Sequence, residues 1–236
     1  MDPSAVAVVA TPLSAAPLVA DRTLPVHDAL TPLLPDGALV RGRSVACTGV
    51  TATSLALALT ATAAQSGAWL AVVDVGWLGV EAAAELGVPL ERLVRVDTDP
   101  AAGRRRAGAW AELMAAVLDG FELVVTSVPA AAGPALVRRV HQRVQARGAV
   151  VVVVGETAAW SSDMTLRTLA ATWEGVADGY GYLRARRVVL ESSGRRVPRP
   201  RRAELWLPGP SAAVEIIPVP APAGPVPVPS VLRPAG

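Results

Sequence analysis

The residues best placed to support chemistry form the octapeptide GVTATSLA at 49–56, between an apolar segment and an alanine-rich one. A nucleotide phosphate loop reads G-x-x-x-x-G-K-[ST], because backbone amides cradle the phosphates, the lysine contacts the β- and γ-phosphates and the hydroxyl binds Mg²⁺. The chain has no lysine at all. We therefore interpret this segment as a degenerate phosphate loop. Its residues are Gly49, Thr51, Thr53, Ser54, Leu55 and Ala56, the last three standing at the G-K-[ST] positions.

Few other side chains could support catalysis or bind a metal. Cys47 is the only cysteine and lies in an apolar run, which favours a small core residue and excludes an intrachain disulfide or a cysteine-based metal cluster. His27 and His141 are far apart in sequence, so surface or capping roles are favoured. Asp74 follows an apolar run, where α/β folds place ligands, but a helix cap or a hydrogen-bonded turn is favoured. No catalytic residue, metal or cofactor is predicted.

A basic segment lies near the end of the chain. Eight arginines fall between 184 and 202, and Glu191 is the only acid among them. Such a segment can bind nucleic-acid phosphates or an acidic protein surface, and Trp173, Tyr180 and Tyr182 add aromatic rings of the kind that bind single strands. Solvated arginines and aromatic residues at core edges are the alternative. The candidate residues for DNA or partner binding are Arg184, Arg186, Arg187, Arg195, Arg196, Arg199, Arg201 and Arg202.

The middle of the chain alternates strand and helix patterns. Apolar strands are predicted at 43–48, 69–75, 93–96, 121–125 and 149–154, and helices at 53–65, 81–86, 109–118 and 134–147. This alternation predicts a doubly wound α/β fold with a mostly parallel sheet. After Gly155 only strands follow, at 165–173, 182–191 and 203–207, with turns at 178–179 and 193–194. These strands predict an antiparallel extension at one edge of the sheet.

The chain should form one domain with flexible ends. We expect a disordered leader over 1–22, a domain over 23–210 and a proline-rich flexible tail over 211–236. The tail is either a docking strap for a partner or inert. The apolar runs at 55–64 and 149–154 are shorter than the roughly 20 residues of a membrane-spanning helix. Because Asp2 and several prolines interrupt any signal peptide pattern, a cytoplasmic protein without membrane contact is expected.

Several segments resemble the RecA family. The segments 29–34 and 37–43 resemble the entry into the RecA core, 72–74 with 85–88 its second strand and helix, and 122–128 its Walker B strand. The resemblance covers about 25–207 and implies a RecA-like fold. The RecA catalytic glutamate would fall near Gly76, and Thr126 replaces the Walker B aspartate. With Leu55, these changes imply that water activation, Mg²⁺ coordination and γ-phosphate contact are lost.

A closer resemblance is to the actinobacterial ImuA-like proteins, RecA-fold accessory factors of the DNA-damage mutasome. The segments that carry it are 24–27, 67–69, 86–93, 173–175, 183–188 and 205–209. The resemblance implies a non-catalytic subunit for translesion synthesis, induced by DNA damage in the SOS response and associated with the nucleoid. Its implied partners are an ImuB-type Y-family polymerase homologue and, through it, a DnaE-type error-prone polymerase and the sliding clamp, with single-stranded DNA as a further candidate. The alternatives are a RecA-like division inhibitor of the SulA type and a weak ATP-binding recombinase paralogue.

Overall fold

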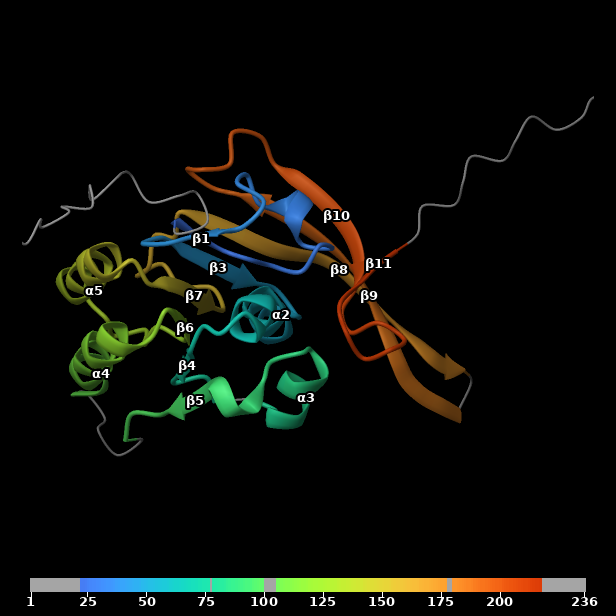
Figure 1. Ribbon diagram of the computed structural model, residues 1–236, viewed down its shortest axis with the longest axis horizontal. Helices are drawn as coiled ribbons and strands as arrows, with labels where there is room; N and C mark the ends of the chain where they lie inside the picture. Colours follow the sequence, from blue (N-terminus) through green and yellow to red (C-terminus); the bar gives the residue numbers. More distant parts are fainter. Residues whose placement is uncertain (1–21, 77, 100–104, 178–179, 218–236) are drawn as a thin grey trace, which may run out of the picture.

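The protein has a mixed α/β architecture built on one large sheet. The computed structural model describes residues 22–76, 78–99, 105–177 and 180–217 (Figure 1). The strands of the sheet are β3 (Ser44–Thr48), β4 (Leu70–Val73), β5 (Leu93–Val96), β6 (Leu123–Thr126), β7 (Val150–Val154), β8 (Met164–Ala177), β9 (Tyr180–Ser193), β10 (Arg201–Trp206) and β11 (Glu215–Ile216). Their order is β11-β10-β9-β8-β3-β7-β6-β4-β5. The pairs from β8 to β5 are parallel and those from β11 to β8 are antiparallel.

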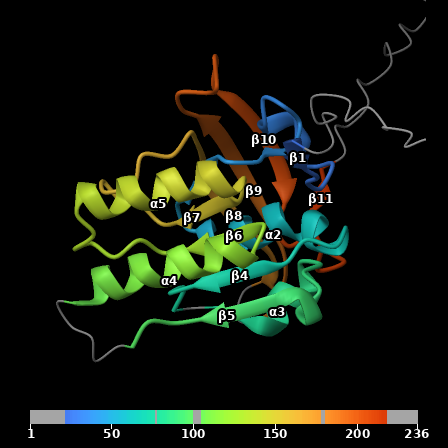
Figure 2. The ribbon, with the colours of Figure 1, turned by 60° about the vertical axis from the view of Figure 1, so that its left-hand side comes forward.

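Helices cover both faces of the parallel strands. The helices are α2 (Ala52–Gln65), α3 (Val80–Glu85), α4 (Arg106–Gly120) and α5 (Pro134–Arg147). Figure 2 shows α4 and α5 side by side on one face, with α2 on the other. Strand alternation separates two cores: Val150 and Val152 of β7 pack in the cluster that contains α2, whereas Val151 and Val153 pack in the cluster of α4 and α5. This arrangement explains why β7 is valine throughout, since both of its faces are buried.

The structure confirms the mixed α/β class and the mostly parallel sheet with an antiparallel extension. The extension is longer than expected, because β8 and β9 have 14 residues each. Three short features were not predicted: the pairing of β1 (Thr23–Leu24) with β2 (Leu39–Val40), and the 3₁₀ turns η1 (Thr31–Leu33) and η2 (Leu90–Arg92). Strand β11 also lies beyond the expected domain end at residue 210, so ordered structure continues past that position.

Three expectations concern residues outside the described part of the chain: most of the leader, the tail from 218 onward and the turn at 178–179. Within the described residues, no helix has the length and apolar character needed to cross a membrane.

Candidate functional site

The Gly49 loop lies at the carboxyl end of β3 and leads directly into α2. A phosphate loop places four residues between its first glycine and the glycine that precedes the lysine. Here only Val50 and Thr51 follow Gly49 before the helix begins at Ala52. Ala52 and Thr53, two of the four residues that would wrap around a phosphate, are therefore part of the helix. The position of the loop agrees with the expected motif, but its backbone is too short to form the same cradle.

Strand β8 closes against this loop. Gly49 has a φ of 89°, and a Cβ atom built on it would lie 2.9 Å from the carbonyl oxygen of Thr168. The hydroxyl oxygens of Thr51 and Thr168 are 2.5 Å apart and both residues are buried. The loop is therefore packed on β8 and hydrogen-bonded to it. A glycine is needed at position 49 for this close approach, which accounts for the residue without any phosphate.

The position of the missing lysine faces the protein core. Leu55 and Ala56 both have 0% exposed surface and belong to the apolar cluster around α2. Thr53 and Ser54 are half-buried in the first turn of the same helix. A side chain at position 55 thus points away from solvent and packs against other apolar residues. Replacing leucine with lysine would place an ammonium group in the core, not beside a bound nucleotide.

The two positions that the RecA resemblance assigns to acidic residues, 126 and 76, have different surroundings. Thr126 ends β6 and is fully buried, and its hydroxyl accepts a hydrogen bond from Trp110 Nε1 at 3.0 Å and donates one to the Ser127 carbonyl at 3.2 Å. Gly76 lies on the surface after β4. The large Trp110 ring therefore occupies the space beside the Walker B position. Neither residue can supply a carboxylate for Mg²⁺ or for activating water.

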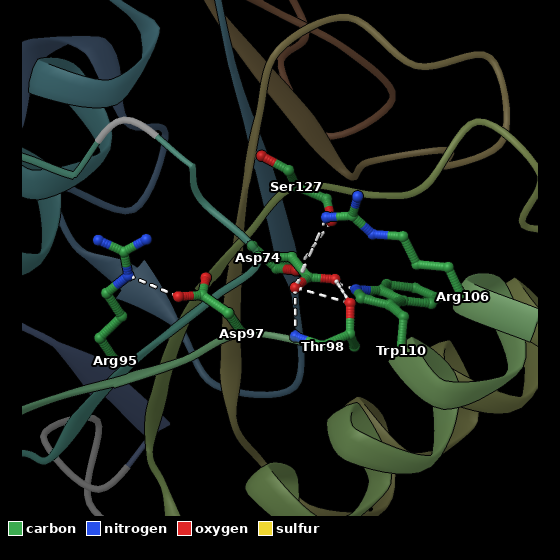
Figure 3. Close-up of polar contacts among 8 residues, drawn as sticks. Asp74, Arg95, Asp97, Thr98, Arg106, Trp110 and Ser127 are labelled. Carbon is green, nitrogen blue, oxygen red and sulfur yellow. Dashed lines mark hydrogen bonds and ion pairs between the residues drawn. The ribbon is translucent and has the colours of Figure 1, made fainter. Parts of the chain in front are cut away.

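Asp74 ties two strands together at the carboxyl edge of the sheet (Figure 3). Its side chain is 2% exposed and accepts hydrogen bonds from the backbone N–H of Thr98 at 2.7 Å and from the Thr98 hydroxyl at 2.8 Å. The Arg106 guanidinium lies 3.9 Å away and compensates the charge. The Asp74 backbone N–H donates to Val96, at the end of β5. Asp74 thus has a structural role, but its partners follow the neighbouring strand β5, so the expected helix cap or hydrogen-bonded turn is not what holds it.

Sequence reasoning missed Thr98 and Arg106 as partners of Asp74. A signal was present for Thr98, because it follows the next strand and the carboxyl ends of parallel strands meet at one edge. Arg106 gave no such signal, since it reaches Asp74 only because α4 packs against the face of the sheet that holds Ala71 and Val73 of β4. A cleft of about 240 Å³ borders this group and is lined by Asp74, Arg106, Ser127 and the segment 128–131. The carboxylate already has its partners, so the cleft offers no free base.

The remaining candidates for chemistry are engaged in the core or in turns. Cys47 is fully buried, and burial raises the pKa of its thiol. The His141 ring stacks on Trp160 with centroids 3.9 Å apart, and burial lowers its pKa. His27 Nδ1 accepts a hydrogen bond from the Ala29 backbone at 3.2 Å, which is a local contact in the turn before η1 and not a helix cap. In the described part of the chain, no group of three or more His, Cys, Asp or Glu side chains is arranged to hold a metal ion.

The structure distributes the eight candidate arginines over both faces of the extension and the loop after β9. Three of them pair with acids: Arg187 with Glu204, Arg195 with Asp163 and Arg202 with Glu191. Two others donate to carbonyl groups: Arg186 to Leu207, and Arg201 to Pro32 and Leu34. Among the described residues, no side-chain partner is found for Arg184, Arg196 or Arg199. Five of the eight arginines are therefore already engaged in contacts within the protein.

A comparison with protein families identifies the parallel core. The model of the MT3502 N-terminal domain matches residues 32–162, which is more than half of the chain. The chain belongs to the MT3502 N-terminal domain family. Within this family match lie the Gly49 loop, Asp74 and the strands from β3 to β7, whereas β8 and the rest of the extension follow it. Among curated proteins, none matches the chain.

Proposed function

We propose that this protein is a non-catalytic, RecA-like accessory subunit of a translesion-synthesis mutasome, which acts by binding an ImuB-type Y-family polymerase homologue. The observation that carries the non-catalytic part is the place of Leu55. It stands where a phosphate loop needs lysine, and it has 0% exposed surface inside the core. The side chain at the lysine position therefore packs in the apolar core and is not available to contact a nucleotide.

Three features support the RecA-like part of the proposal. The Gly49 loop connects a strand in the middle of a parallel sheet with a helix on its face, as a phosphate loop does. The helices lie on both faces, and an antiparallel extension continues from one edge. Membership in the MT3502 N-terminal domain family is consistent with an ImuA-like protein.

The buried groups favour a role through contact. The Thr126 hydroxyl is bonded to Trp110, and the Asp74 carboxylate is bonded to Thr98 and paired with Arg106. Phosphoryl transfer needs a metal, a positioned nucleophile and cations on the phosphates. Since these positions are committed to structural bonds, we infer a pseudo-ATPase whose surface, including the extension, binds other proteins and, as a further candidate, single-stranded DNA.

Two measurements test this function. The purified protein should hydrolyse no Mg²⁺–ATP above background, with an active RecA-type ATPase as the positive control; turnover that survives further purification would contradict the pseudo-ATPase proposal. Co-purification from cells treated with a DNA-damaging agent should recover the ImuB-type protein, with the DnaE-type polymerase and the sliding clamp as indirect partners. Recovery of the division protein FtsZ without any polymerase component would instead support a SulA-type inhibitor.

A further inference from the structure

The outer half of the β8–β9 hairpin is a two-stranded ribbon without a third strand. We define the distal ribbon as residues 169–177 and 180–185. Strand β3 pairs with β8 only over 164–167, and β10 pairs with β9 only over 187–192. Within the described residues, both edges of the distal ribbon are thus unpaired, and Figure 1 shows it projecting from the body of the protein. Open strand edges readily pair with other chains, so an arm of this kind suits an interaction.

An irregular β-bulge shapes the distal ribbon. Glu174 pairs with Ala185 and Val176 pairs with Gly181, so three residues of β9 oppose one residue of β8. That one residue is Gly175, which has a φ of 99°, and a Cβ atom there would clash with the Tyr182 carbonyl. The Arg184 side chain also lies against Gly175. The segment from Tyr182 to Arg184 is therefore pushed outward, and only glycine at position 175 permits this.

The bulge exposes apolar side chains. Tyr182 is 79% exposed and Leu183 is 57% exposed, and Trp173 on the neighbouring strand is 42% exposed. Single exposed apolar residues are ordinary, but here three are found on one short arm that has little core of its own. Such a group is typical of a surface that another molecule covers.

The charges beside this group are not compensated. The Arg186 guanidinium lies 4.9 Å above the Trp173 ring and donates to the Leu207 carbonyl, but it has no carboxylate partner in the described structure. Burial lowers its pKa, which shows that the charge is partly desolvated. Arg187, which faces the opposite side of the strand, does have an acid partner in Glu204. Arg184 has none. A carboxylate from outside would complete the pairing of Arg184 and Arg186.

We propose that the distal ribbon binds an extended segment of a partner protein in which acidic side chains alternate with apolar ones. The carboxylates pair with Arg184 and Arg186, and the apolar side chains pack on Tyr182 and Leu183. Single-stranded DNA fits this surface less well, because the Arg186 guanidinium covers the Trp173 ring and Leu183 offers no face for a base. The inference rests on the proposed function only in taking the ImuB-type protein as the carrier of that segment.

The test compares binding of the ImuB-type protein to full-length variants. Leu183→Ser and Arg184→Glu should each weaken binding about tenfold or more, as expected for residues at the centre of an interface. The matched controls are Val50→Ser, an 82% exposed apolar residue on the Gly49 loop, and Arg138→Glu, an exposed arginine of α5 for which no side-chain partner is found among the described residues. Both should bind like the wild type. Equal binding by all four variants would overturn the ribbon proposal while leaving the proposed function intact.

A second probe separates the two proposals. If the wild-type protein does not bind the ImuB-type protein, the proposed function fails. The ribbon is then tested with a synthetic peptide of alternating glutamate and leucine, against one of alternating lysine and leucine. Preference for the acidic peptide that is lost in Arg184→Glu supports the ribbon proposal, and no preference overturns it. Tighter binding of an oligothymidine that depends on Tyr182 and Arg184 would overturn it in favour of a nucleic acid.

Discussion

Placing a lysine at position 55 provides the sharpest test of whether the Gly49 loop could hold a nucleotide. In Leu55→Lys, the new side chain replaces one with 0% exposed surface on α2. If only the residue type at this position prevented nucleotide binding, the variant would gain affinity for Mg²⁺–ATP. Since the loop is short and packed on Thr168, we expect no gain in affinity and a large loss of stability.

The size of the loss follows from the cost of burying the amine. A lysine of ordinary pKa about 10.4 must lose its proton to enter an apolar core, which at pH 7 costs about 4.6 kcal/mol at about 1.36 kcal/mol per pH unit. For a domain of this size, each kcal/mol lowers Tm by about 2–4 °C, so a decrease of roughly 10–18 °C is expected.

The pH dependence has a definite sign. The folded-state pKa of Lys at position 55 is lowered, so between that pKa and about 10.4 the unfolded state binds more protons than the folded state. The stability of the variant relative to the wild type should therefore rise with pH, by roughly 4 kcal/mol between pH 7 and pH 10. Urea unfolding followed by circular dichroism at several pH values measures this difference.

Two control variants isolate the buried charge. Leu55→Met keeps the volume and should cost less than about 1.5 kcal/mol. Val50→Lys adds the same charge at an 82% exposed position of the loop and should change stability by less than about 0.5 kcal/mol. A Leu55→Lys protein that melts like the wild type and binds Mg²⁺–ATP at micromolar concentration would refute the reasoning, because it would show an open cradle.

Three further predictions concern single residues. Asp74→Ala should cost about 3 kcal/mol of unfolding free energy, because it removes the acceptor for Thr98 and leaves Arg106 unpaired, and Asp74→Asn should cost less; an Ala variant as stable as the wild type in urea would contradict this. Gly175→Ala should open the distal ribbon to limited proteolysis, whereas Gly67→Ala, with a similar φ of 111° but no atom within 4 Å of the new Cβ, should not; equal cleavage would remove the bulge from the argument. Because burial lowers the pKa of His141, the unfolded state takes up the proton first, so stability should fall as pH decreases below about 6.5, and His141→Phe should flatten that slope. Asp163 and Arg195, the charges that act on His141, stay unchanged in that variant, and an unaltered slope would assign the pH dependence to other groups.

The order of the elements was readable from the sequence because it rests on local patterns. The valine run became β7, and the helix expected at 134–147 is α5. Element ends were less certain: β8 extends to Ala177, beyond the expected end at 173, because its outer half pairs with β9 across the bulge at Gly175. The short β11 was missed, since its two residues form a strand only by pairing with β10.

The candidate site was likewise predictable from the sequence only in part. The absence of lysine is a fact of residue identity, whereas the assignment of Thr126 to an aspartate position comes from the resemblance to RecA. The spacing of the arginines predicts a basic segment, but it does not predict which arginines form ion pairs. Glu204 and Asp163 reach Arg187 and Arg195 only in the folded chain. Among the described residues, Arg184 and Arg186 have no acidic partner, and Arg186 lies over the Trp173 ring. These two unpaired charges could be recognised only after the other pairs were known.

The sequence by itself determined that the chain has no lysine and predicted that strands and helices alternate around the Gly49 loop, because composition and periodicity are local properties of the chain. Only the tertiary structure decided that the backbone of this loop is too short and too closely packed to hold a phosphate. Leu55 points into the core, Thr168 of a distant strand closes on Gly49, and Trp110 bonds to Thr126. These contacts join residues far apart in sequence, and their geometry depends on how the whole sheet and its helices pack.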